Sequence, residues 1–353
     1  MPLTKVQSRG TENVGQGSSN LIINGAMTIS QRGSSFASAN GYTLDRYGYY
    51  RSGGGAVTVS QDTDTPSDFK NSLKIAVTTN DSSVTSGDYY ILQQKIEGQN
   101  IAQLNYGSSD AKTTTLSFFV KSSVTGTYSG SLRNQATDRS FVFQYTVSSA
   151  NTWEQKSIAI VGDTSGTWLT SNDTGISLVF SLGQGTTYAS STVGSWHSGN
   201  YHGSTTEQDF ISNASATFYI TGIQLESGSQ ASDFQHEDIG TTLAKCDRYY
   251  QKSEGNNYTV FLVGGIDSSG GSAYVSRRLR VPMRAIPSFS FSNSYLYSVP
   301  SNTVTYTGSL DNRSDKDIVT IGFQQIDGDT ADGHSIRFES SGDSGEVEFD
   351  AEL

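Results

Sequence analysis

Aromatic and imidazole side chains gather in one segment of the chain that could bind a ligand. The segment GSWHSGNYHGS, residues 194–204, places Trp196, His197, Tyr201 and His202 among glycines and serines, without the alternation of a strand. Exposed aromatic rings stack on the apolar faces of sugar rings, and imidazole groups bond sugar hydroxyls. The segment therefore predicts a glycan-binding loop. The alternative is that Trp196 and Tyr201 fold back and close one end of a β-sandwich.

Covalent and acid–base catalysis find little support in the residues present. The chain contains four histidines and one cysteine. The string GDSG at residues 342–345 is similar to the nucleophile loop of chymotrypsin-like proteases, but no Ala-His context precedes it, so a tight turn explains it better. Glycoside hydrolysis needs two carboxylates at a defined separation, and nothing marks a pair among Glu207, Asp209, Glu226, Asp233 and Glu237. We therefore expect no enzymatic activity and no cofactor.

One acidic loop has the ligands of a hard cation. The segment DGDTADG at residues 327–333 contains Asp327, Asp329 and Asp332. Carboxylate oxygens suit calcium, but the third carboxylate comes one position later than in an EF-hand loop. A solvated turn is favoured, with weak calcium binding as the alternative.

Charge and composition narrow the choice of partners. The 353-residue chain has a formal net charge of −11, which disfavours nucleic acid because phosphate binding needs clustered Lys and Arg. The single cysteine, Cys246, excludes an intramolecular disulfide framework. No apolar run approaches the roughly 20 residues of a spanning helix, and residues 1–20 have no signal-like core. We expect no membrane insertion.

Two-residue alternation predicts the strands that must position these side chains. The chain is 11% aromatic, with 37 Gly and 5 Pro, which is typical of a protein dense in strands and turns. One apolar face and one polar face per strand indicate stacked antiparallel sheets, so we expect a jelly-roll β-sandwich over residues 21–236. The clearest strands carry Leu73, Ile75 and Val77; Leu116, Phe118 and Val120; Phe141, Phe143, Tyr145 and Val147; and Ile176, Leu178, Phe180 and Leu182.

A helical period appears once, at residues 237–253. Apolar residues recur there at steps of three and four, and Thr241 or Thr242 could serve as N-cap. We expect a connector helix, followed over residues 254–353 by a smaller C-terminal β-sandwich whose last strand runs to Leu353. Residues 1–20 are polar and without periodicity, as in an extended arm. The stripe of the helix comprises Ile239, Leu243, Cys246 and Tyr250.

Two segments near the start of the chain resemble a known family. NLIINGAMTISQRG at residues 20–33 and YTLDRY at residues 42–47 resemble the opening of a widespread group of phage tail-fibre and appendage proteins. That group carries an NLIINGAM-type strand, a QRG element and a DR-aromatic motif. The matching positions include Asn24, Gly25, Arg32, Asp45 and Arg46.

Two further matches follow in the same order along the chain. TFYITGIQLESG, DFQHE and LAKCDRYYQK are similar to the group's QLE-x-G strand, F(E/Q)HR-like corner and C-x-RYY helix. RVPMRAIP and the final FDAEL are similar to its VPMRATP strand and AEL tail. Asp238 departs from the pattern, because an aromatic or prolyl residue is common there. The positions that match in the middle of the chain include Gln224, Glu226, Arg248 and Tyr249.

The resemblance implies a carbohydrate-binding-module-like jelly roll, a helical connector and a C-terminal β domain, usually assembled as a homotrimer, and it does not imply a catalytic site. The motif residues also admit structural roles. Asn24 and Gly25 suit a strand-to-turn transition, and Asp45 and Arg46 could pair with each other. Glu226 could accept hydrogen bonds from Arg32 or Arg46.

These observations favour a bacteriophage virion protein, a tail fibre or similar appendage, assembled in the bacterial cytoplasm. Its exposed loops would bind a host glycan or protein, and its N-terminal arm would dock to other virion proteins. One alternative is a capsid-attached fibre or decoration protein without a receptor role. A second is a polysaccharide depolymerase, although such enzymes commonly use repetitive β-helices and the chain has no repeat of that kind.

Overall fold

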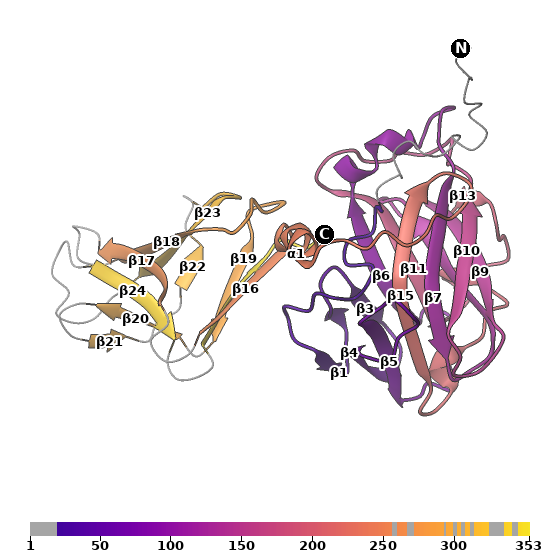
Figure 1. Cartoon of the computed structure of the whole chain (residues 1–353), viewed down its shortest axis with the longest axis horizontal. Helices are drawn as coiled ribbons and strands as arrows, with labels where there is room; N and C mark the ends of the chain where they lie inside the picture. Colours follow the sequence, from indigo (N-terminus) through magenta and orange to yellow (C-terminus); the bar gives the residue numbers. More distant parts are fainter. Residues whose placement is uncertain are drawn as a thin grey trace, which may run out of the picture. The chain divides into compact units, whose positions relative to one another are not determined.

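The chain divides into two compact units, each built mostly of antiparallel strands (Figure 1). Residues 1–237 form the N-terminal unit and residues 238–353 form the C-terminal unit. The computed structural model describes residues 20–255, 260–266, 272–292, 294–298, 302–304, 308–310, 314–324, 335–340 and 345–353.

Two large sheets form the N-terminal unit. Sheet A has the strand order β1 (Ser35–Ala37), β4 (Ala56–Asp62), β5 (Ser72–Thr79), β15 (Thr217–Ser227), β7 (Thr114–Ser122) and β10 (Glu154–Ile160). Sheet B has the order β13 (Trp196–Ser198), β9 (Arg139–Val147), β8 (Gly126–Arg133), β11 (Thr174–Gln184), β6 (Tyr89–Glu97), β3 (Gly48–Arg51) and β2 (Gly41–Tyr42). The remaining elements are the parallel pair β12 (Ala189–Ser190) and β14 (Gly203–Ser204), and the 3-10 turns η1 (Gly98–Asn100), η2 (Ala102–Leu104) and η3 (Phe210–Ser212).

The inward faces of sheets A and B share one core. On β11, Ile176, Leu178, Phe180 and Leu182 are at most 1% exposed, and the predicted apolar residues of β5, β7 and β9 join the same cluster. Burying a side chain of this size stabilises the fold by about 1.5–3 kcal/mol. The predicted all-β sandwich is therefore confirmed, and each of the four clearest strands lies where alternation placed it.

The C-terminal unit also stacks two sheets around its own core. The smaller sheet has the order β16 (Tyr250–Gly255), β25 (Gly345–Asp350) and β19 (Ser288–Ser292). The larger has the order β21 (Asn302–Val304), β20 (Ser294–Ser298), β24 (Ser335–Ser340), β17 (Val260–Ile266), β18 (Ser272–Arg278), β23 (Ile318–Gln324) and β22 (Gly308–Leu310). Its core combines Leu262, Val275, Ile321 and Phe338 of the larger sheet with Val347 and Phe349 of β25.

The helix α1, Ile239–Asp247, is shorter than predicted and starts from a different cap. Its N-cap is Asp238, whose carboxylate accepts hydrogen bonds from two main-chain N–H groups of the first turn, at 2.9 and 3.2 Å. The predicted caps Thr241 and Thr242 therefore lie inside the helix. The predicted extension to residue 253 is wrong because Tyr250 begins β16, which pairs with β25 over its whole length. Among the described residues, no helix is long and apolar enough to cross a membrane.

Candidate ligand-binding cleft

The outward face of sheet B is partly covered by a segment that follows it in the chain. On β11, Ser177, Val179 and Ser181 alternate with the core residues and point away from the core. Their exposed fractions are nevertheless 5%, 0% and 1%. Residues 185–208, which we call the covering segment, connect β11 to η3 and hydrogen-bond to this face.

Serine hydroxyls of sheet B hold the covering segment. The carboxyl group of Glu207 accepts hydrogen bonds from Ser129 of β8 and from Ser181 of β11, the latter at 2.7 Å. Ser129 Oγ also accepts from the main-chain N–H of Ser204 at 2.8 Å. Ser140 of β9 donates to the carbonyl of Gly199 at 2.5 Å. Because these contacts run across three adjacent strands, they fix the segment as a wall on the sheet.

A cleft of about 320 Å³ opens between this wall and the uncovered part of sheet B. Its floor is made by outward residues of β3 and β6, which are Tyr50, Tyr89, Ile91, Gln93 and Lys95. The remaining lining side chains are Arg133 of β8 and, from the covering segment, Tyr188, Asn200 and His202.

The aromatic side chains of the cleft are fixed by contacts with one another. The ring of His202 stacks on Tyr188, with centroids 4.4 Å apart and an interplanar angle of 8°. Tyr89 meets both rings edge-on, at 5.1 Å from His202 and 5.3 Å from Tyr188. Edge-to-face and stacked pairs are favourable ring geometries. The cleft therefore presents a rigid aromatic surface beside the amide groups of Gln93 and Asn200.

Burial lowers the pKa of the two basic groups beside this surface. Burial lowers the pKa of Arg133 to about 10, and the side chain still carries its charge at neutral pH. Burial, with the nearby Arg133 charge, lowers the pKa of His202 to about 2, so its imidazole is neutral. The Nδ1 atom of His202 has no hydrogen-bond partner among the described residues. A neutral imidazole can accept or donate one hydrogen bond, which suits a hydroxyl ligand.

Only one of the four predicted ligand residues lines this cleft. Trp196 packs against the core through Trp168, Tyr106 and Phe141, with centroids 5.1 to 5.8 Å apart, and donates to the Val161 carbonyl at 2.6 Å. It therefore follows the packing alternative. The segment is also not wholly a loop, because Trp196–Ser198 forms β13 at the edge of sheet B.

The other two predicted ligand residues pair with each other. His197 stacks on Tyr201 at 5.0 Å, and its Nε2 lies 2.8 Å from the hydroxyl of Ser190. Neither residue lines the cleft. The structure thus brings His202 into the candidate site and leaves Trp196, His197 and Tyr201 outside it.

The first motif residues have structural roles around one turn. Asn24 has φ of 60° and is 3% exposed, and its amide donates to the carbonyls of Ile29 and Asp45 at 2.9 and 3.0 Å. A Cβ on Gly25 would lie 2.2 Å from the carbonyl oxygen of Ile223, so only glycine fits. Asp45 accepts hydrogen bonds from the main chain and the side chain of Gln31, at 2.6 and 2.8 Å.

The arginines of these motifs do not bond to Glu226 as predicted. Arg46 donates to the Lys95 carbonyl at 2.6 Å, and the guanidinium of Arg32 lies over the ring of Tyr42 at 5.3 Å. Glu226 instead accepts from the main-chain N–H and the hydroxyl of Ser232, both at 2.8 Å, and from Gln224 at 3.0 Å. Neighbouring residues of β15 and of the chain just after it therefore supply the hydrogen bonds of the buried Glu226 side chain.

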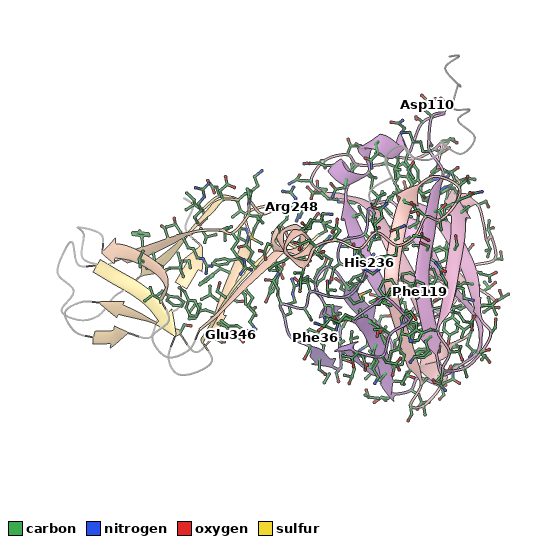
Figure 2. The ribbon with its side chains drawn as sticks, in the orientation of Figure 1. Phe36, Asp110, Phe119, His236, Arg248 and Glu346 are labelled. Carbon is green, nitrogen blue, oxygen red and sulfur yellow. The ribbon has the colours of Figure 1, made fainter. Side chains whose placement is uncertain are left out.

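A second aromatic group explains the corner that follows β15. Phe69 contacts Phe119 of β7, Phe234 and His236, with centroids 5.3, 5.0 and 5.1 Å away, and Phe119 and His236 are both labelled in Figure 2. Phe119 lies on the outward face of sheet A, because its neighbour Phe118 is in the core. The aromatic corner is thus explained by packing on sheet A.

The motifs of the C-terminal unit meet in one hydrogen-bond network. The carbonyl of Arg248, the residue after α1 (Figure 2), accepts from the N–H of Arg284, and the carbonyl of Tyr249 accepts from Ala351, each at 2.8 Å. Arg284 in turn donates to the carbonyls of Ala351 and Glu352 at 2.9 and 3.1 Å. The predicted last strand is too long, because β25 ends at Asp350. The hydrogen bonds of this network hold Ala351 and Glu352, which follow β25.

The predicted catalytic and metal candidates form no comparable site. None of the residues that line the cleft is Asp or Glu. Among the described residues, no group of three His, Cys, Asp or Glu side chains could hold a metal ion. The calcium candidates Asp327, Asp329 and Asp332, and most of the GDSG string, lie outside the described residues.

Sequence reasoning missed most of the cleft. One signal was present in β6, where the run YYILQQK places Gln93 and Lys95 on the face opposite Leu92. The same face of this sheet-interior strand also carries Tyr89 and Ile91, and such a mixture of aromatic, apolar and polar side chains is typical of a binding surface. Arg133, Tyr188 and Asn200 carried no such signal, because only the folded covering segment brings them to β6.

Comparison with known proteins gives similarity of fold. No protein-family model matches the chain, and no curated protein matches it by sequence. Solved structures that it resembles include the enzymatically active domain of tailspike protein 4 of bacteriophage CBA120, with 14% identity over 59% of this chain and 21% of that one, and a TM-score of 0.32.

Two carbohydrate-binding modules are among the other similar structures. The family 11 module of a Clostridium thermocellum cellulase is 14% identical over 56% of this chain and 96% of its own, with a TM-score of 0.28. The CBM22-1 xylan-binding domain of Paenibacillus barcinonensis Xyn10C is 12% identical over 62% and 99%, with a TM-score of 0.26.

Proposed function

We propose that this chain binds a glycan in the cleft of its N-terminal unit. The observation that carries the proposal is the set of fixed rings formed by Tyr89, Tyr188 and His202 beside the amides of Gln93 and Asn200. Rings contact the C–H faces of a sugar, while amide and imidazole groups bond its hydroxyls. A preformed concave site of this kind is what small polar ligands need.

We also propose that the protein is a subunit of a bacteriophage tail fibre or similar appendage, assembled as a homotrimer. The resemblance of its motifs to that group supports the assignment, as does the convergence of the C-x-RYY, VPMRA and AEL segments in one network. Weak binding by one cleft would be strengthened by three copies on one fibre. The cleft would then contact a glycan on the host surface.

The proposal assigns no catalysis to the cleft. Its lining includes no carboxylate, and the carboxylate of Glu207 is engaged by Ser129 and Ser181 beneath the covering segment. Incubation of the protein with host polysaccharide should therefore release no oligosaccharide. Release that is abolished by Glu207→Ala and Asp209→Ala would overturn this part of the proposal.

Glycan-array binding with the full chain tests the proposed ligand class. Tyr50→Ala removes a half-buried ring from the cleft floor and should weaken binding about tenfold. Tyr219→Ala is a matched control, because it removes a half-buried ring from sheet A, away from the cleft. Equal loss in both variants, or no glycan bound by the parent chain, would contradict the proposal.

The assembly is tested separately from the ligand. Mass measurement in solution should give three copies of the chain per particle. Labelling of purified virions with an antibody to the chain should mark the tail. A monomer, or labelling spread over the capsid, would contradict the assignment as a tail appendage.

A further inference from the structure

We infer that the cleft selects an acidic glycan, and that Arg133 binds a carboxylate of the sugar. This inference rests on the proposed glycan-binding function and names its substrate class. The ligand would contain a hexuronate or another sugar acid, in which a planar carboxylate is attached to a ring that the aromatic surface can contact.

The first observation is that the sign of charge in the cleft opposes that of the whole chain. The chain contains 34 Asp and Glu against 23 Lys and Arg. The cleft, however, is lined by Lys95 and Arg133 and by no acidic residue. These two residues project from β6 and β8, the strands on either side of β11, and line the same cleft. A cleft of one sign attracts ligands of the other.

The second observation is that Arg133 lacks the bidentate carboxylate partner that two other arginines of the chain have. Arg139 donates through Nε and Nη2 to the carboxylate of Asp163, at 2.7 and 2.6 Å. Arg280 uses the same edge of its guanidinium toward Asp247, at 2.9 and 2.8 Å. Both pairs are bidentate, which is the geometry that a guanidinium prefers with a carboxylate.

Arg133 is more buried than either of these arginines and bonds to no carboxylate within the part of the chain that the structure describes. Its residue is 5% exposed, and its Nη1 donates to the amide oxygen of Asn200. Its Nε is buried and has no hydrogen-bond partner among the described residues. A buried charge without a counter-charge is costly, and a ligand carboxylate that accepts from this guanidinium where it lines the cleft would lower that cost.

The neighbouring histidine does not compete for this role. Its stack on Tyr188 holds the His202 ring in place, and the ring is neutral beside Arg133. The site therefore divides its functions between a cation for the acid group and neutral polar groups and rings for the rest of the sugar.

The test compares acidic polymers with their neutral counterparts, using the full chain and titration calorimetry. The probes are oligogalacturonate, oligoalginate and oligosialate, the same oligomers after reduction of their carboxyl groups to alcohols, and dextran sulfate. We expect at least one acidic oligomer to bind at least tenfold more tightly than its reduced form. Charge-assisted hydrogen bonds have strengths that correspond to about 10- to 100-fold in affinity.

Variants separate the guanidinium from general charge. Arg133→Met keeps the buried stem and should weaken acid binding about 10- to 100-fold, whereas Arg133→Lys should restore part of it. Lys70→Met removes the same charge from an exposed position outside the cleft and should leave affinity unchanged. Unfolding temperatures of the variants show whether any loss comes from misfolding.

Three outcomes would overturn the inference. Reduced oligomers that bind as tightly as acidic ones would refute acid selection while leaving glycan binding intact. Equal binding of dextran sulfate, or equal losses in Arg133→Met and Lys70→Met, would show that charge alone acts. If no oligomer binds in titration calorimetry and no glycan binds on the array, the proposed function itself is refuted.

Discussion

The carboxyl group of Glu207 is a buried acid that holds the covering segment to sheet B. Burial, with a smaller effect of the nearby Asp209 charge, raises its pKa to about 8. The hydroxyls of Ser129 and Ser181 act in the opposite direction, because they stabilise the ionised form. The folded protein therefore holds this proton at neutral pH, whereas the unfolded chain releases it near pH 4.5.

This difference predicts how stability depends on pH. Between about pH 4.5 and pH 8 the folded state binds more protons than the unfolded state, so stability is highest at low pH and falls as pH rises. The contribution of one group is at most about 1.4 kcal/mol per pH unit. Glu207→Gln puts a group that is neutral at every pH in the same place, with one oxygen that can still accept from a serine and an NH2 that can donate to the other, and it removes this loss. Urea denaturation of both proteins from pH 5 to pH 9 should show curves that diverge up to pH 8 and run parallel above it.

A control on a different acid keeps this result specific. Glu154 also lies in the N-terminal unit, and hydrogen bonds with Lys156 and the backbone lower its pKa despite some burial. Glu154→Gln should therefore change the profile only at acidic pH. Divergence of the same form in both variants would contradict the assignment to Glu207.

At the level of single residues, prediction from sequence worked where a role is local. Asn24 and Gly25 were assigned to a turn, and the structure shows why only an amide and a glycine fit there. The predicted arginine partners of Glu226 were wrong because Ser232, only six residues further along the chain, donates the hydrogen bonds to its carboxylate. Arg133 and Asn200 are 67 residues apart, and no local pattern connects them.

At the level of elements, α1 offers a direct test of its cap. Asp238→Ala removes the side chain that accepts from the first turn, and this should lower the stability of the C-terminal unit by about 1 kcal/mol. Asp238→Asn retains the acceptor and should restore most of the loss. Thermal unfolding followed by circular dichroism measures both effects. An alanine variant as stable as the parent would show that the cap contributes nothing.

The positions of the strands were easier to predict than the end of α1 and the covering segment, which both depend on contacts with strands distant in sequence. A period of two persists along β5, β7, β9 and β11, because each strand has one face on the core. The C-terminal end of α1 was misplaced because β16 draws its hydrogen bonds from β25, which is nearly one hundred residues away in sequence. The covering segment could not be predicted for the same reason, because the hydrogen bond between Glu207 and Ser129 joins residues 78 positions apart.

At the level of the whole molecule, the two separate cores predict two unfolding transitions. Each unit has its own apolar cluster, and each is large enough to unfold cooperatively. Differential scanning calorimetry should therefore resolve two peaks. Glu207→Gln at pH 8 should shift only the peak of the N-terminal unit, and Asp238→Ala only that of the C-terminal unit. A single peak that moves as a whole in both variants would contradict independent cores.

The covering segment begins and ends at the same place on the sheet. The hydroxyl of Ser181 donates hydrogen bonds to Gln184, just before the segment, and to Glu207 near its end. The residues between them therefore form a loop that leaves sheet B and returns to the same point. Tyr188, Asn200 and His202 all belong to that loop, whereas the residues of the cleft floor belong to the strands. Exchange of one continuous cassette would therefore replace a wall of the cleft and leave the scaffold intact. Such an exchange offers a short evolutionary route to a cleft with a different lining.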